Sequence, residues 1–223
     1  MNFTVHRIDQ RSPEWAALRL GRVTGSRVAD MLATVKSGEA AGRRNLRVQL
    51  VLERITGRTQ EKNFMSPAMQ EGTDRESEAY AYYEGLTGEM LSRTGFLAHN
   101  DLMTGTSLDG HVGDWEGTVE IKCPIAATHL EYVKTGVVPG EYLKQIQHGL
   151  WLTGAEWCDW MSYHPEFPDP LKAKVVRVHR AKLDMVAYET ALLKFLAEVD
   201  AEVAAIRTLS DLHSVLKEVV HAV

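Results

Sequence analysis

The sequence predicts an α/β (α+β) fold in which helices flank a central mixed sheet. Three observations support this class. Stretches with helical apolar periodicity lie before residue 90 and after residue 124. A β-branched, alternating stretch at 118–122 lies between them, and two further strand-like stretches follow at 157–163 and 174–179. Strands mixed with helices in this way are typical of layered α/β domains.

Length and composition predict one domain, residues 1–223, with a helical N-terminal part and C-terminal helices. A chain of 223 residues with 44% hydrophobic residues can bury a full core. No apolar run approaches the ~20 residues of a membrane span and the first residues lack a signal-peptide core, so we expect a cytoplasmic protein without a membrane partner. Cys123 and Cys158 are too few for a disulfide framework or a four-cysteine metal site.

Capping residues set the first helices. Ser12 and Pro13 open a helix over 13–20, because a serine N-cap and a proline at the first position suit a helix start. Residues 24–26 are expected to cap a second helix, whose free N–H groups would also suit a phosphate. A third helix is expected over 43–55.

The next segments combine one helix with several strands. A helix over 66–86 carries Glu76, which is either an exposed helical acid or part of a site. Strand-like stretches follow at 89–97, 102–109 and 118–122, and predict a three-stranded antiparallel arrangement.

The rest of the chain alternates between helix and strand. Apolar spacing predicts a helix over 142–152, and the strands at 157–163 and 174–179 are expected to pair antiparallel. A long apolar stripe then predicts a helix over 186–206, followed by a short helical tail.

The strand at 118–122 carries its chemistry on one face. A period of two puts Glu120 and Lys122 together and apolar residues on the other face. The Gly- and Asp-rich segment 110–117 turns the chain back, so that Asp109 and Glu120 are expected to converge across a hairpin.

Two carboxylates beside an ammonium suit a hard divalent cation. Mg²⁺ prefers oxygen ligands and is usually held by one or two carboxylates. Lys122 would then orient an attacking water and offset charge that develops on a phosphate. An exposed strand face with a Glu/Lys pair is the alternative interpretation.

Charge is distributed unevenly along the chain. The net charge of −5 argues against a uniformly basic DNA-binding surface but leaves room for a local basic channel. The basic residues of segment 36–58 are Lys36, Arg43, Arg44, Arg47, Arg54 and Arg58. They predict contacts with phosphates, whereas a solvated helix face is the alternative.

Five blocks in a consistent order resemble the phage lambda exonuclease family, also called YqaJ-type viral recombinase nucleases, within the PD-(D/E)xK superfamily. They are WAALRLG at 15–21, VTGS at 23–26, SLDG at 107–110, EIKCP at 120–124, and QIQ at 145–147 followed by Trp151. The resemblance implies a restriction-endonuclease-like mixed sheet and a single PD-(D/E)xK nuclease domain. Leu108 stands where the family has proline, and a further acid of the family falls on His99, Asn100 or Asp101.

The resemblance also implies roles for individual residues. It makes Asp109 and Glu120 metal ligands together with the Ile121 carbonyl, Lys122 the nucleophile-positioning lysine, and Glu76 and Gln145 supporting catalytic groups. It suggests Arg19, Ser26 and Ser107 as a pocket for a 5′-terminal phosphate. Lys36 and Met69 fall where the family places a strand-pulling basic residue and an apolar wedge.

The activity implied by the resemblance is digestion of one strand of linear duplex DNA. It would run 5′→3′ with Mg²⁺, or with Mn²⁺ as a substitute, release mononucleotides and leave a 3′ single-stranded overhang for recombination. The implied partners are linear DNA with a 5′-phosphate, a single-strand annealing protein and two further copies in a homotrimer. A phage or prophage origin within a bacterial host would follow.

Two other functions remain open. An endonuclease of restriction or repair type would use the same acids without needing a 5′-phosphate pocket, so circular DNA separates the two. A non-catalytic DNA-end-binding module would keep the fold without turnover, and only a metal-dependent cleavage assay decides that question.

Overall fold

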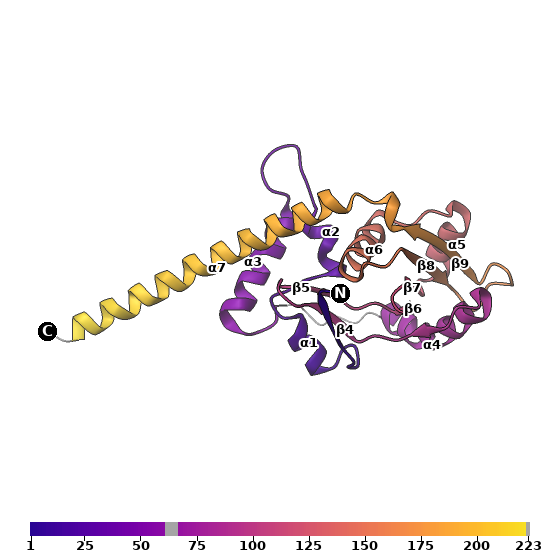
Figure 1. The fold of residues 1–223 in the computed structure, drawn as a ribbon, viewed down its shortest axis with the longest axis horizontal. Coiled ribbons are helices and arrows are strands. Elements are labelled where there is room, and N and C mark those ends of the chain that lie inside the picture. The colour runs from indigo at the N-terminus through magenta and orange to yellow at the C-terminus, as the bar shows by residue number, and fades with distance from the viewer. Residues whose placement is uncertain (61–66, 222–223) are drawn as a thin grey trace.

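Two sheets form the centre of the molecule and helices surround them (Figure 1). The structure, a computed structural model, describes residues 1–60 and 67–221, with side chains described for 1–60 and 70–211. The four-stranded sheet has the order β1 (Phe3–His6), β4 (Phe96–His99), β5 (Thr104–Thr106), β2 (Val23–Thr24). The five-stranded sheet has the order β3 (Leu91–Ser92), β6 (Gly110–Val112), β7 (Gly117–Lys122), β8 (Trp157–Tyr163), β9 (Ala173–His179).

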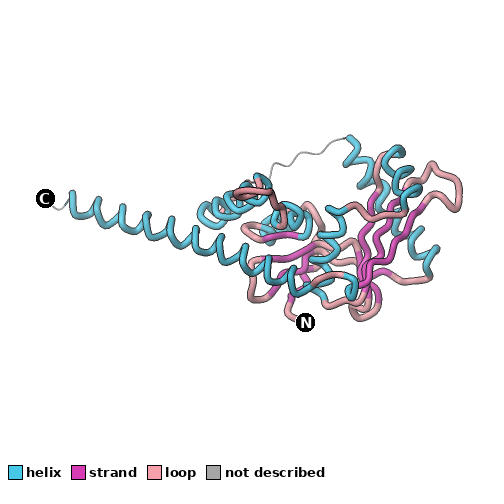
Figure 2. The backbone as a smooth tube through the Cα atoms, turned by 90° about the horizontal axis from the view of Figure 1, so that it is seen from above, coloured by secondary structure: helices cyan, strands magenta, loops and turns pink. Residues whose placement is uncertain are grey.

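Each sheet contains one parallel pair and is therefore mixed. β2 runs parallel to β5, and β7 runs parallel to β8, while the other pairs are antiparallel. Figure 2 shows the strands in two groups, with helices around them. The predicted mixed α/β class is confirmed, with the strands divided between two sheets.

The predicted three-stranded antiparallel arrangement is wrong. Residues 89–97 are divided between β3 and β4, which belong to different sheets, and residues 102–109 contain only the short strand β5. Gly95 shows why the first stretch is interrupted, because a Cβ there would lie 2.4 Å from the His6 and Ile8 carbonyl oxygens. Only glycine fits this close approach, which lies where the chain leaves one sheet for the other.

The N-terminal helices largely follow their capping signals. In α1 (Pro13–Arg19) the Ser12 side chain accepts a hydrogen bond from the Trp15 N–H, as a serine N-cap should. α3 (Ala41–Thr56) ends at Gly57 in the left-handed conformation, φ 65°. The predicted second helix is different, since it consists of a 3₁₀ turn, η1 (Gly25–Arg27), and one α-helical turn, α2 (Val28–Met31), without a side-chain cap at Thr24.

The remaining helices are longer. They are α4 (Pro67–Thr87), α5 (Ala126–Thr135), α6 (Gly140–Thr153) and α7 (Met185–His221), with a 3₁₀ turn η2 (Arg180–Lys182) before α7. The predicted long helix and its tail form one continuous helix, which leaves the body of the molecule toward the C-terminus (Figure 1). Within the described residues, none of the helices is long and apolar enough to cross a membrane.

Apolar faces tie these helices to the sheets. α3 and α7 share a buried cluster that includes Leu46, Leu50, Leu192 and Phe195. Full burial of such side chains stabilises the fold by roughly 1.5–3 kcal/mol each. On the other side of the molecule, Val119 and Ile121 of β7 pack with α4, and this packing fixes the strand that carries the candidate site.

Candidate active site

The chain passes from one sheet to the other through residues 107–109, and the candidate site lies where it arrives. Asp109 precedes β6, and Gly110 faces Val119 of β7 in the antiparallel register. The Asp109 carboxylate (Oδ2) accepts a hydrogen bond of 2.6 Å from the Ile121 N–H. β6 and β7 form the predicted hairpin, and it places Asp109 against Ile121, the residue next to its expected neighbour Glu120.

The other chemical residues meet on one face of β7. Glu120 Oε1 lies 2.5 Å from the Lys122 ammonium and accepts a hydrogen bond of 2.7 Å from the Gln145 side-chain amide of α6. The Lys122 nitrogen lies 5.1 Å from the centre of the Tyr142 ring. The predicted alternation is confirmed, because the neighbouring residues of the strand face the core.

Burial controls the charges of this group. It raises the pKa of Asp109, against the opposing effect of the Lys122 charge. It raises the pKa of Glu120 to about 7, which Lys122 opposes and the Asp109 charge reinforces. Burial alone would lower the pKa of Lys122, but Glu120 and Asp109 outweigh it and raise that pKa above its usual value. One ammonium therefore leaves the two carboxylates only partly compensated.

Glu76 of α4 lies at the edge of the same site. Together with Asp109 and Ile121 it lines a cleft of about 430 Å³. Its carboxylate (Oε1) is 3.6 Å from the Arg11 guanidinium (Nη2). Burial raises the pKa of Glu76, and the negative charge of Asp109 raises it further. The carboxylate of Glu76 is therefore close enough to Asp109 to interact with it.

The residues present fit a divalent cation. Among the described residues no group of three or more His, Cys, Asp or Glu side chains has the geometry of a metal site. The available donors are the carboxylates of Asp109 and Glu120 and the carbonyl of Ile121, an all-oxygen set with few protein ligands, as Mg²⁺ commonly has. Burial disfavours the charged forms of both acids, and a bound cation would offset that cost.

Arg19 and Ser107 are connected through Trp15. The Trp15 indole N–H donates a hydrogen bond of 2.8 Å to the Ser107 hydroxyl, and the Arg19 guanidinium lies 4.1 Å from the centre of the Trp15 ring. Ser26 is exposed, and its neighbour Gly25 packs so tightly that a Cβ there would lie 2.5 Å from the Thr106 hydroxyl oxygen. The 3₁₀ turn that carries Ser26 thus packs against the residue before Ser107.

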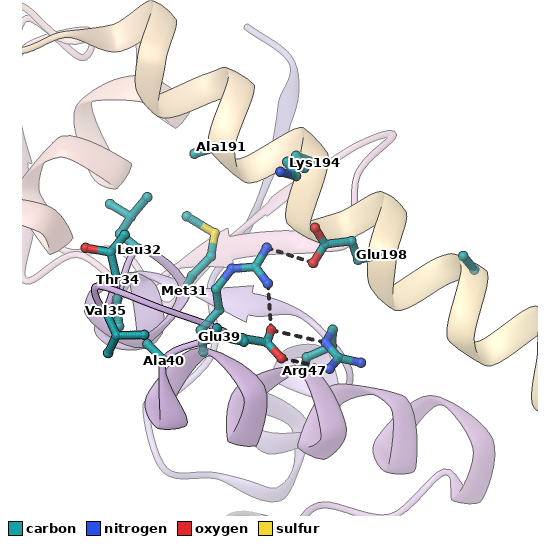
Figure 3. Close-up of a pocket in the computed structure, with 14 residues that line it drawn as sticks. Met31, Leu32, Thr34, Val35, Glu39, Ala40, Arg47, Ala191, Lys194 and Glu198 are labelled. Atoms are coloured by element: carbon teal, nitrogen blue, oxygen red, sulfur yellow. Dashed lines mark hydrogen bonds and ion pairs between the residues drawn. The ribbon is translucent and has the colours of Figure 1, made fainter.

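Three of the basic residues of segment 36–58 have carboxylate partners. Arg54 pairs with Asp200 of α7 at 2.5 Å. Arg43 pairs with Glu198 of α7 at 2.7 Å, and Arg47 pairs with Glu202 of the same helix. Both also contact Glu39, and Figure 3 shows this arrangement at a cavity of about 770 Å³ between α3 and α7. Their charges are paired with carboxylates in a part-buried contact between two helices, an arrangement that neither a phosphate contact nor a solvated helix face describes.

The other predicted DNA contacts differ in position. Lys36 and Arg44 are exposed. Met69 belongs to α4, but its side chain lies outside the part of the chain whose side chains are described. The candidates for the further acid surround the end of β4, where Asp101 accepts a hydrogen bond from the Asn2 side chain. None of these candidates lines the cleft of Glu76.

Sequence reasoning missed two residues of the site. Tyr142 precedes Gln145 by three positions on α6, a spacing that places both on one helix face and gave a usable signal. Arg11 gave none, because its approach to Glu76 depends on a tertiary contact between a turn and α4.

Comparisons with known proteins identify the family of the chain. The model of the YqaJ-like viral recombinase domain matches residues 14–156. The alkaline exonuclease LHK-Exo from Laribacter hongkongensis is 41% identical over 90% of this chain and 100% of its own, with a TM-score of 0.81. Its complex with dAMP matches with the same identity and coverage and a TM-score of 0.80.

A more distant structure shares the fold alone. The phage related exonuclease from Haemophilus somnus 129PT is 12% identical over 85% of this chain and 96% of its own, with a TM-score of 0.64. No curated protein gives a significant match. The family model covers well over half of the chain and the identity to LHK-Exo extends along nearly all of it. The chain therefore belongs to the YqaJ-like viral recombinase domain family and is a homologue of an alkaline exonuclease.

Proposed function

We propose that the protein is a Mg²⁺-dependent 5′→3′ exonuclease that digests one strand of linear duplex DNA. The observation that carries the proposal is the group of Asp109, Glu120 and Lys122 at strand β7 in a homologue of an alkaline exonuclease. Asp109 accepts a hydrogen bond from the Ile121 N–H, and Glu120 lies at hydrogen-bond distance from Lys122. An oxygen-donor pair beside a lysine suits phosphodiester hydrolysis, since charge develops on the phosphate oxygens during attack.

Each residue of the group has a distinct task. Asp109, Glu120 and the Ile121 carbonyl would hold the metal ion, which would supply Lewis acidity and a water of lowered pKa. Lys122, kept protonated by its carboxylate neighbours, offsets charge on the phosphate in the transition state. Gln145 holds the Glu120 carboxylate in place, and Glu76 adds negative charge at the edge of the cleft.

The 5′→3′ direction rests on the proposed pocket of Arg19, Ser26 and Ser107. Because Trp15 donates to the Ser107 oxygen, the hydroxyl hydrogen of Ser107 remains available to a phosphate. A terminal phosphomonoester carries more charge than an internal diester, so the Arg19 guanidinium favours a strand end.

The same proposal covers the product and the partners. The relative LHK-Exo forms a complex with dAMP, a mononucleotide of the kind that digestion would release. We infer that the remaining 3′ strand passes to a single-strand annealing protein and that the enzyme works as a homotrimer around DNA. Lys36 and Arg44, both exposed, are the proposed backbone contacts outside the site.

Initial rates on matched duplexes test the proposal. We expect the wild-type protein with Mg²⁺ to degrade linear but not circular duplex, and to degrade 5′-phosphorylated ends faster than 5′-hydroxyl ends. Arg19→Ala should lose most of that preference and keep slow cleavage, whereas Arg207→Ala, an exposed arginine of α7, should behave as wild type. Cleavage of circular duplex, or equal wild-type rates on both ends, would contradict the exonuclease assignment.

A further inference from the structure

Three arginines line the cleft beside the candidate metal ligands, and the proposed function uses none of them. Arg7, Arg11 and Arg93 line the cleft of about 430 Å³ together with Asp109 and Glu76. They come from the turn before α1 and from the connection between β3 and β4. No residue of the proposed 5′-phosphate pocket lines this cleft.

Arg11 is held over the cleft by an unfavourable backbone conformation. Its φ is 72°, in the left-handed region that a residue with a Cβ rarely adopts. The turn is closed by the Ser12 N–H, which donates to the Asp9 carbonyl at 3.2 Å, and by Ser12 as the N-cap of α1. Such strain persists where surrounding structure fixes it, and it concentrates at functional positions. Here it directs a guanidinium toward Glu76.

The other two arginines lack an ion-pair partner at contact distance among the described side chains. For the side chains of residues 1–60 and 70–211, no ion pair is found for Arg7 or Arg93, in contrast to Arg43 and Arg47 on α3. Arg93 lies 4.2 Å from the centre of the Tyr80 ring. The Tyr80 hydroxyl is buried without a hydrogen-bond partner among the described residues, and Tyr80 lines the same cleft. A buried, unpaired hydroxyl costs free energy unless a ligand satisfies it.

We propose that this cleft is a second phosphate-binding site, which takes a backbone phosphodiester of the DNA strand next to the bond that is cut. The inference rests on the proposed function and deepens it. Guanidinium groups and a hydroxyl donate hydrogen bonds to phosphate oxygens, and the phosphate would compete with Glu76 for Arg11. The site would hold the strand beside the metal ligands after the terminal phosphate has entered its own pocket.

DNA binding without catalysis tests the proposal. Fluorescence anisotropy with a labelled, 5′-phosphorylated linear duplex in EDTA gives the dissociation constant at several salt concentrations. Arg11→Gly and the double variant Arg7→Gln/Arg93→Gln should bind about tenfold more weakly or worse. The slope of log K against log salt should fall by about 0.9 for each arginine lost. Arg207→Gln should match the wild type.

The choice of substitutions separates charge from folding. Arg11→Gly removes the backbone strain, so its melting temperature should be equal to or above that of the wild type even though DNA binding weakens. Arg11→Lys keeps the charge and should keep the salt slope. A lower melting temperature for Arg11→Gly, with an unchanged salt slope, would show that the arginine is structural and overturn the proposal.

Competition distinguishes the source of the phosphate. If the cleft binds the DNA backbone, dAMP should bind the wild type and the arginine variants with similar affinity. A selective loss of dAMP binding in the variants, with unchanged duplex binding, would assign the site to the mononucleotide and overturn the backbone proposal. If the wild-type protein degrades DNA and the arginine variants bind duplex normally, the second phosphate site is contradicted and the proposed function stands. If the wild-type protein has no nuclease activity, the proposed function itself is contradicted.

Discussion

Gln145 and Gln147 lie two residues apart on α6 but have different partners. The Gln145 amide donates to the Glu120 carboxylate, and the Gln147 amide donates to the Asp184 carbonyl near the surface. Because Gln145 orients a candidate metal ligand, we expect Gln145→Ala to reduce Mg²⁺ affinity or turnover about 10- to 100-fold. Gln147→Ala should remain close to wild type. Equal effects of the two substitutions in calorimetric Mg²⁺ titration and cleavage assays would disprove this role.

Lys122 is expected to act on the transition state. Lys122→Ala should lower turnover by at least about 100-fold, because the ammonium stabilises charge that appears only during attack. Circular dichroism should show an intact fold, and exposed Lys182→Ala serves as the control. The buried Glu120 would lose its cation, so Mg²⁺ binding should also shift to higher pH. Wild-type turnover in Lys122→Ala would remove the lysine from the mechanism.

Site residues that strand alternation places could be predicted from the sequence. Glu120 and Lys122 alternate along β7, and Asp109 is placed opposite them by a short turn, so a local rule is sufficient for all three. Arg43 and Arg47 show the limit of composition. A basic run does not reveal that α7, 155 residues later, supplies carboxylates that pair with these two arginines.

At the scale of elements, His148 links a helix, a strand and α7. Its Nε2–H donates to the Gly105 carbonyl of β5 at 3.0 Å, so its Nδ1 accepts from the Tyr188 hydroxyl of α7. Burial lowers the pKa of His148 to about 4. The side chain is therefore neutral in the fold, and protonation breaks the acceptor contact.

This linkage predicts acid sensitivity of the fold. Below pH 6.5 the unfolded chain binds a proton at His148 that the folded chain does not, so stability falls as the pH decreases toward 4. The loss would reach roughly 3 kcal/mol. Urea unfolding of the wild type and of His148→Gln, which cannot titrate, should show a difference in stability that shrinks as the pH falls. A difference that is constant with pH would contradict the prediction.

Elements were predictable where a local signal ends them. Gly57 and Gly154 take left-handed conformations at helix ends, and the sequence alone placed both ends correctly. The strands between residues 89 and 109 were not predictable in the same way. They belong to different sheets, and the close backbone approach at Gly95 between them is visible only in the packed chain.

At the scale of the whole molecule, the class of the fold followed from the order of helices and strands, but the presence of two sheets did not. Partners in the four-stranded sheet are far apart in sequence, since β1 pairs with β4 and β2 with β5. Hydrophobic alternation shows that a residue belongs to a strand and does not show which sheet receives it.

The passage from one sheet to the other has a consequence for the products of the proposed enzyme. Ser107 of the proposed phosphate pocket and the metal ligand Asp109 are separated by Leu108 alone, whose side chain is buried and whose carbonyl accepts a hydrogen bond from Thr94. Two residue steps span at most about 7 Å. Under the proposed function, this short connection fixes the distance between the 5′-phosphate pocket and the metal ligands. That distance would set the length of each released product at one nucleotide.

An insertion can lengthen the connection between Ser107 and Asp109. A glycine inserted between Ser107 and Leu108 should shift the released products from mononucleotides toward longer fragments, as mass spectrometry of the digest would show. The same insertion in the β6–β7 turn after Gly113 lies outside this connection and should leave the products unchanged. If a folded, active variant with the Ser107–Leu108 insertion still releases mononucleotides, the distance between Ser107 and Asp109 does not set the product length. The DNA or another pair of contacts would then set it.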